Sequence, residues 1–144
     1  MIHILSNKIL ILCFTLLLSF ISSTSYAHGD KDNAAVKREL LTVDALANIP
    51  QHQLTSVRIE LATNMSVPAH KHQGFVFVYV LEGTVRSQLN DEEIKTYQKG
   101  DVWTEPPGVT HSLTENASDS KIAKILAVFV AHKEAILSTS AEIK

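Results

Sequence analysis

The feature that most constrains the fold is a series of short segments in which apolar and polar residues alternate. The segment that begins at Gln53 alternates Val57, Ile59 and Leu61 with polar neighbours, which is typical of a β-strand with one face toward solvent. Comparable segments, separated by turn residues, are TVRSQLN, EIKTYQ, DVWTE, HSLTEN and KIAKILAVFVA. This spacing of short strands and turns predicts an all-β domain, either a sandwich or a barrel.

The segment 75–81, FVFVYVL, differs from the others because it is apolar on both of its faces. A strand of this kind is usually covered on both sides. The two-residue period of a strand places Val76 on the inward face and Phe75 and Phe77 on the outward face. We therefore expect the outward residues to make packing contacts or to form the interface of a homodimer.

The first 27 residues are expected to lie outside the fold. Lys8 precedes an apolar run at residues 9–21, and two small residues, Ser25 and Ala27, follow. This order is typical of a secretory signal peptide that is cleaved after Ala27, whereas the run is short for a membrane span. The alternative is an uncleaved anchor. We predict a secreted or periplasmic protein with no membrane contact after cleavage.

Cleavage would leave one domain of ordinary size. Residues 28–37 are polar and charged and are expected to be flexible, and residues 38–144 are expected to form a single domain with a short C-terminal tail. The chain has 13 basic and 15 acidic residues, a net charge of −2, so no basic surface for nucleic acid is indicated. Its one cysteine, Cys13, lies in the predicted leader. Metal ligands in the mature protein would therefore be histidine, carboxylate or amide groups.

Three histidines have the spacing of a metal site. His70 and His72 are separated by one residue, so in an extended strand both side chains point the same way. His111 follows about 40 residues later, on a segment that we interpret as a returning strand, and we predict that the three bind one divalent metal ion. The alternative is a set of hydrogen-bonded histidines in a barrel without metal. His52 and His132 are expected to be ordinary surface or hydrogen-bonded residues.

Two segments, 64–83 and 100–116, resemble the paired signature motifs of the cupin superfamily, with YVLEG and EPPGVTH as their most characteristic words. The matching positions are Asn64, His70, His72 and Gly83 in the first motif and Gly100, Pro106, Gly108 and His111 in the second. The resemblance implies a double-stranded β-helix, or jelly-roll barrel, in which His70, His72 and His111 bind the metal. Each motif occurs once, so the chain resembles small secreted bacterial proteins with a single cupin domain.

One departure from the family pattern concerns the expected metal. Val76 stands where the family has a glutamate ligand, on the same inward face as His72. Its presence would leave three neutral imidazoles, which favour iron, zinc, copper or nickel over manganese, and Val76→Glu is expected to tighten manganese binding. Glu105 and Gln88 are candidates for a fourth ligand that the sequence alone does not place. Asn64 replaces a glycine, but asparagine tolerates a left-handed backbone.

The resemblance implies a metal-dependent oxygenase or isomerase acting on a small organic molecule. The alternatives are a non-catalytic small-molecule or metal-binding module and a structural partner with a vestigial pocket; no catalytic residue is assigned. Open positions on the metal would suit dioxygen or a bidentate ligand. Inward Val76, Val78 and Val80 predict a dry pocket for a compact, weakly polar ligand. Because imidazoles must be neutral to bind metal, affinity is expected to weaken as the pH falls through about 6.

Overall fold

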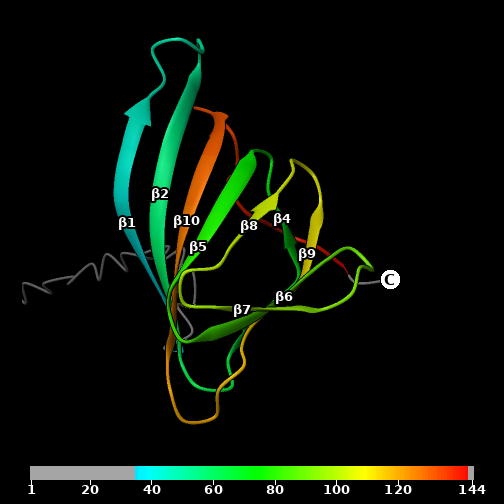
Figure 1. The fold of residues 1–144 in the computed structure, drawn as a ribbon. Coiled ribbons are helices and arrows are strands. Elements are labelled where there is room, and N and C mark those ends of the chain that lie inside the picture. The colour runs from blue at the N-terminus through cyan, green and yellow to red at the C-terminus, as the bar shows by residue number, and fades with distance from the viewer. Residues whose placement is uncertain (1–34, 143–144) are drawn as a thin grey trace, which may run out of the picture.

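The computed structural model describes residues 35–142, and its regular elements there are all β-strands (Figure 1). The strands are β1 (Val36–Ala45), β2 (His52–Leu61), β3 (Ser66–Val67), β4 (His70–Lys71), β5 (Phe75–Glu82), β6 (Thr84–Leu89), β7 (Lys95–Gln98), β8 (Val102–Glu105), β9 (Thr110–Asn116), β10 (Ala123–His132) and β11 (Thr139–Ser140). Within these residues, no helix is long and apolar enough to span a membrane. The all-β prediction is confirmed.

The strands form two antiparallel sheets that face each other. The first sheet has the order β1-β2-β10-β5-β8, and the second has the order β11-β4-β9-β6-β7, with β3 paired to β9. Neighbours in both sheets come from distant parts of the chain, because β10 lies between β2 and β5 and β9 lies between β4 and β6 (Figure 1). This arrangement is consistent with the jelly-roll barrel that the sequence predicts.

The core lies between the two sheets and comes mostly from the first one. Every second residue is buried in β10 and, in β5, from Val76 to Val80, as the two-residue period of a strand requires. The buried apolar side chains are Val36, Leu61, Val76, Val78, Val80, Val85, Trp103, Ala123, Ile125, Ala127 and Phe129. Alternation in the sequence therefore identifies the face that β5 and β10 bury.

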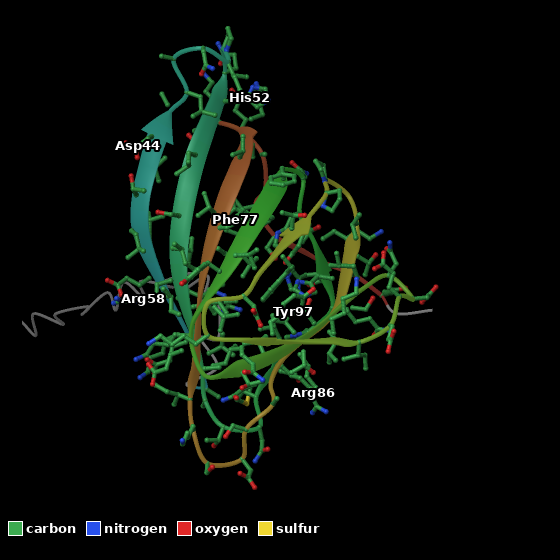
Figure 2. All side chains as sticks on the ribbon, viewed as in Figure 1. Asp44, His52, Arg58, Phe77, Arg86 and Tyr97 are labelled. Carbon is green, nitrogen blue, oxygen red and sulfur yellow. The ribbon has the colours of Figure 1, made fainter. Side chains whose placement is uncertain are left out.

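The outward face of β5 carries large apolar side chains. Phe75, Phe77 and Tyr79 are 39%, 37% and 36% exposed, and Figure 2 labels Phe77 on this sheet. Each alternates with a buried valine, as predicted for a strand that is apolar on both faces. The homodimer predicted from this face stays a prediction.

The predicted boundary at residue 38 differs from the start of the first strand. The predicted signal peptide, residues 1–27, lies outside the described residues, and so does most of the predicted flexible segment, 28–37. The strand β1 begins at Val36, which is 4% exposed and pairs with Leu61 of β2. Because this valine is buried in the core, the first strand includes the last two residues of that segment.

Candidate metal centre

Two short strands bring the three predicted histidines together. His70 lies on β4 directly opposite His111 on β9, and His72 follows His70 by two residues in extended chain. One ring nitrogen from each histidine lies within 4.8 Å of the others. Donors to one ion lie roughly 3–4 Å apart when the metal–nitrogen bonds are about 2.1 Å, so the three nitrogens lie near the spacing that one ion requires.

Backbone carbonyls fix the orientation of two of the rings. Nδ1 of His70 lies 2.8 Å from the Pro68 carbonyl oxygen, and Nδ1 of His72 makes a short contact with the Leu137 carbonyl oxygen. A carbonyl oxygen only accepts hydrogen bonds, so each Nδ1 carries a hydrogen, and in the neutral rings each Nε2 keeps its lone pair. This is how protein groups usually orient histidine ligands of metals.

His111 is held by side chains on both sides of its ring. The Ser87 hydroxyl lies 2.7 Å from Nε2, and the Thr114 hydroxyl lies 2.9 Å from the same atom. On the other side, Nδ1 lies 3.1 Å from Oε1 of Glu105. The imidazole is 3% exposed, so these contacts fix its position in the interior of the barrel.

Glu105, at the end of β8, places a carboxylate beside the histidines. It is 3% exposed, and its Oε1 accepts a hydrogen bond of 2.9 Å from Nε1 of Trp103. Its Oε2 lies 3.3 Å from Nε2 of His72, yet it has no hydrogen-bond partner among the described residues. Two atoms with lone pairs at this separation need a proton or a cation between them. The donor set therefore fits a divalent metal ion.

Of the two candidates for a fourth group, Glu105 lies beside the three imidazoles and adds a carboxylate to the site. Val76 of β5 pairs with Glu105 of β8, so the two side chains lie side by side on the inward face. The carboxylate comes from the neighbouring strand instead of from position 76. Because it supplies a charged oxygen, the argument against manganese becomes weaker. Gln88 does not lie at the site, since its Nε2 donates to the Glu92 carbonyl.

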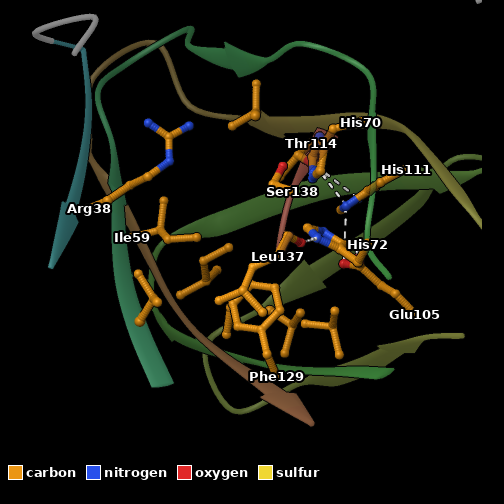
Figure 3. Close-up of a pocket in the computed structure, with 16 residues that line it drawn as sticks. Arg38, Ile59, His70, His72, Glu105, His111, Thr114, Phe129, Leu137 and Ser138 are labelled. Carbon is orange, nitrogen blue, oxygen red and sulfur yellow. Dashed lines mark hydrogen bonds and ion pairs between the residues drawn. The ribbon is translucent and has the colours of Figure 1, made fainter. Parts of the chain in front are cut away.

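The histidines line one end of a pocket of about 200 Å³. Figure 3 shows His70, His72, His111 and Glu105 gathered on one side of it. The apolar residues that line it are Val57, Ile59, Val67, Val76, Val78, Ile125, Ala127, Phe129 and Leu137. The pocket therefore combines a small polar centre with a large apolar wall, which is a common design of small-molecule sites.

The sequence matches the family described as Cupin domain over residues 57–129. The chain belongs to the cupin family. Both motif histidine segments lie within this match, and so do the strands that carry Glu105 and Val76. No curated protein sequence matches this cupin.

Solved structures show the same fold. An uncharacterized conserved protein with a double-stranded β-helix domain from Klebsiella pneumoniae is 18% identical with a TM-score of 0.60, covering 76% of this cupin and 87% of that chain. An RmlC-like cupin from Shewanella frigidimarina is 22% identical with a TM-score of 0.56, covering 69% and 79%. The polyketide cyclase RemF from Streptomyces resistomycificus is 18% identical with a TM-score of 0.58, covering 76% and 73%. At these identities the likeness establishes the fold alone.

The ionisable groups of the centre have strongly perturbed pKa values. Burial lowers the pKa of His70 to about 4, although the Pro68 carbonyl opposes the shift. Burial also disfavours the charged form of His72, but the Glu105 carboxylate and the Leu137 carbonyl outweigh it and raise the pKa of that ring. Burial opposes ionisation of Glu105, yet the adjacent rings of His111 and His72 and the hydrogen bond from Trp103 hold its pKa well below the usual range. At neutral pH, the site therefore contains a neutral His70 and an ionised Glu105.

These pKa shifts predict how metal binding depends on pH. A proton on Nε2 of His72 competes with the metal, and the raised pKa means that this proton is bound already above pH 6.5. Metal affinity should therefore fall as the pH drops through the raised pKa of His72, by about tenfold per pH unit for one displaced proton. His70 adds its own competition only near pH 4. Chelator competition between pH 8 and pH 5 measures this slope, and an unchanged affinity would contradict it.

Several groups at this centre were not predicted from the sequence. Ser87 and Thr114, which contact His111, lie on inward positions of β6 and β9. A hydroxyl side chain among inward valines is a usable signal, because Ser87 shares the parity of Val85. The Leu137 carbonyl, which orients His72, is a backbone atom in the predicted tail, and no side-chain pattern indicates its role.

Proposed function

We propose that this cupin binds one divalent transition metal ion at His70, His72 and His111 and acts on a compact organic molecule in the adjoining pocket. The observation that carries the proposal is the facing pair of His72 Nε2 and Glu105 Oε2, 3.3 Å apart and buried. A cation held by the three histidines would also compensate the buried charge of Glu105. When bound, such a metal supplies Lewis-acid or redox chemistry.

The residues of the pocket support oxygenase or isomerase chemistry on a chelating substrate, such as a diketone, an enediol or a catechol-like oxyanion. The apolar wall excludes water from the reacting end of the ligand, which strengthens the electrostatic interactions there. Glu105 and the hydroxyls of Ser87 and Thr114 hold His111 in place. An enzyme with this fold exists among the structural neighbours, namely the polyketide cyclase RemF.

A non-catalytic binding module is the second candidate. It is favoured by the predominance of aliphatic side chains around the pocket, since these bind a ligand by burial and take no part in proton transfer. Oxygen consumption by the metal-loaded protein with a panel of diketones, phenolics and flavonols separates the two candidates. Ligand binding without turnover of any compound would favour the binding module.

The metal content of the purified protein tests the proposal. We expect about one transition-metal ion per chain by elemental analysis, a loss of this metal in His70→Ala, and no change in His132→Ala. His132 is the matched control because it contacts His52 at the end of β10 and does not line the pocket. Equal metal content in both variants, with both folded by circular dichroism, would refute the proposed site.

A further inference from the structure

The positively charged side chain of Arg38, on β1, points toward the pocket. Arg38 pairs with Ile59 of β2, and both residues line the cavity. Its neighbours on β1, Lys37 and Glu39, face the other way. Lys37 forms an ion pair with Glu60, and Glu39 forms one with Arg58. Among residues 35–142, no carboxylate forms an ion pair with Arg38. Unlike the other charges of its strand, this guanidinium therefore has no partner in the described protein.

The polar groups of the pocket lie at two opposite sides. Figure 3 shows Arg38 across the cavity from His70, His111 and Glu105, with the apolar wall between them. The one carboxylate that lines the pocket, Glu105, is engaged with His72, His111 and Trp103 at the far side. The guanidinium is therefore available to a ligand that enters the pocket.

The size of the pocket and its two polar sides together define a ligand class. A dry cavity of about 150 Å³ is large enough for benzene, so a cavity of about 200 Å³ takes a body of roughly that size with small substituents. A guanidinium presents two parallel N–H donors that match both oxygens of a carboxylate. A ligand with an apolar body, a carboxylate at one end and an oxygen donor at the other would satisfy both sides.

We propose that Arg38 is the specificity-determining residue of the pocket and that it binds the carboxylate of a small monocarboxylic acid whose opposite end reaches the histidines. The inference deepens the proposed function, on which it rests for the role of the histidine end. It replaces the weakly polar ligand expected from the sequence with an anionic one. The part of the inference that concerns Arg38 can be measured without turnover.

The test compares two probes of equal size and shape, 4-hydroxybenzoate and its neutral amide, 4-hydroxybenzamide. Calorimetric titration of the metal-loaded full chain should show that the acid binds about tenfold more tightly than the amide, as charge-assisted hydrogen bonds are worth roughly this factor. Arg38→Gln should remove the preference by weakening the acid about tenfold while changing the amide by less than about twofold. Arg38→Lys should keep part of the preference for the acid, because lysine retains the positive charge but lacks the two parallel N–H donors of the guanidinium.

The matched control is Arg58→Gln, which removes the same charge from the outward face of the neighbouring strand. Arg58, labelled in Figure 2, pairs with Glu39 across β1 and β2 and does not line the pocket. The Arg58→Gln variant should bind both probes with unchanged affinity. A loss of acid binding equal to that in Arg38→Gln would show a general charge effect and would overturn the inference.

Three further outcomes would also overturn the inference. They are an absence of preference in the unaltered protein, an equal weakening of both probes by Arg38→Gln, and no binding of the acid at about 10 mM. Repeating the titration after chelator treatment separates this result from the proposed function. A preference that depends on Arg38 in a protein that never binds metal would support the inference and refute the metal centre. A protein that binds metal but does not prefer the acid would support the metal centre and refute the inference.

Discussion

Glu105→Gln should weaken divalent-metal binding by about 100-fold, the upper range for the loss of a group that supports metal ligands. Glutamine keeps the shape of the side chain and a hydrogen-bond acceptor for Trp103, so the fold should persist. It removes the negative charge that contacts both His72 and His111. Competition with a chromophoric chelator measures the affinity for zinc and for manganese. Glu60→Gln is the control, because Glu60 is an outward carboxylate paired with Lys37.

Comparing the loss of zinc affinity with the loss of manganese affinity shows how Glu105 acts. If Oε2 is a ligand, manganese should lose more affinity than zinc, because manganese favours oxygen donors and imidazole suits zinc. An equal loss for both metals would show that Glu105 only positions His72 and His111. Affinities that equal those of the Glu60→Gln control would show that the carboxylate has neither role.

The structure also changes the expected effect of restoring the family glutamate. Val76→Glu alone would place a second carboxylate next to Glu105, since the two positions are directly paired and their Cβ atoms lie about 5 Å apart. Two buried carboxylates at this distance do not both ionise readily. We therefore expect Val76→Glu to lower the free energy of unfolding by about 3 kcal/mol and not to improve manganese binding, contrary to the expectation from sequence.

The double variant Val76→Glu/Glu105→Val exchanges the two side chains between β5 and β8. It returns the carboxylate to the family position and keeps one buried charge, so it should recover most of the metal affinity that Glu105→Gln loses. Urea denaturation should also show that it is more stable than Val76→Glu. A double variant that binds metal as weakly as Glu105→Gln would show that only the β8 position serves the site.

The strands and the shared side of His70 and His72 were predictable because both depend on short-range patterns. The two-residue period gives the face of each strand, and the H-x-H spacing puts His70 and His72 on the same side. That His111 joins them was predicted from its sequence separation and from the cupin resemblance, whereas the pairing of β4 with β9 that sets His111 opposite His70 is visible only in the structure. The order of the strands in the sheets depends on pairings between distant segments, which local patterns do not specify.

The carboxylate of the centre was only a candidate from sequence, although a signal was present. Trp103 and Glu105 are two residues apart in DVWTE, so a strand that buries the tryptophan must also turn Glu105 inward. An acidic residue at an inward position is a sign of function, since such a charge is buried only with partners. The sequence does not show which strand lies beside β8. Only the pairing of β8 with β5 shows that this carboxylate lies beside Val76.

The second large effect is expected at Gly83, in the turn between β5 and β6, where a substitution should lower the stability of the fold. Gly83 has a φ of 78°, and a Cβ atom there would lie 2.6 Å from the Ile122 carbonyl oxygen and 2.9 Å from Cα of Ala123. Both contacts are with backbone of the segment that leads into β10, which cannot move without shifting that strand. The sequence shows Gly83 as a motif glycine, but its close approach to Ile122 and Ala123 is visible only in the structure.

Gly83→Ala should therefore lower the free energy of unfolding by about 3 kcal/mol, through a left-handed backbone penalty of about 1 kcal/mol and an overpacking cost of about 2 kcal/mol. Gly108→Ala separates the two terms, because Gly108 has a φ of 79° but no atom within 4 Å of the added Cβ. It should lose only about 1 kcal/mol. Thermal melts should show a difference of about 10 °C between the two variants. Equal losses would mean that the strand of Ala123 yields to the added methyl group, and that the backbone conformation alone requires glycine at position 83.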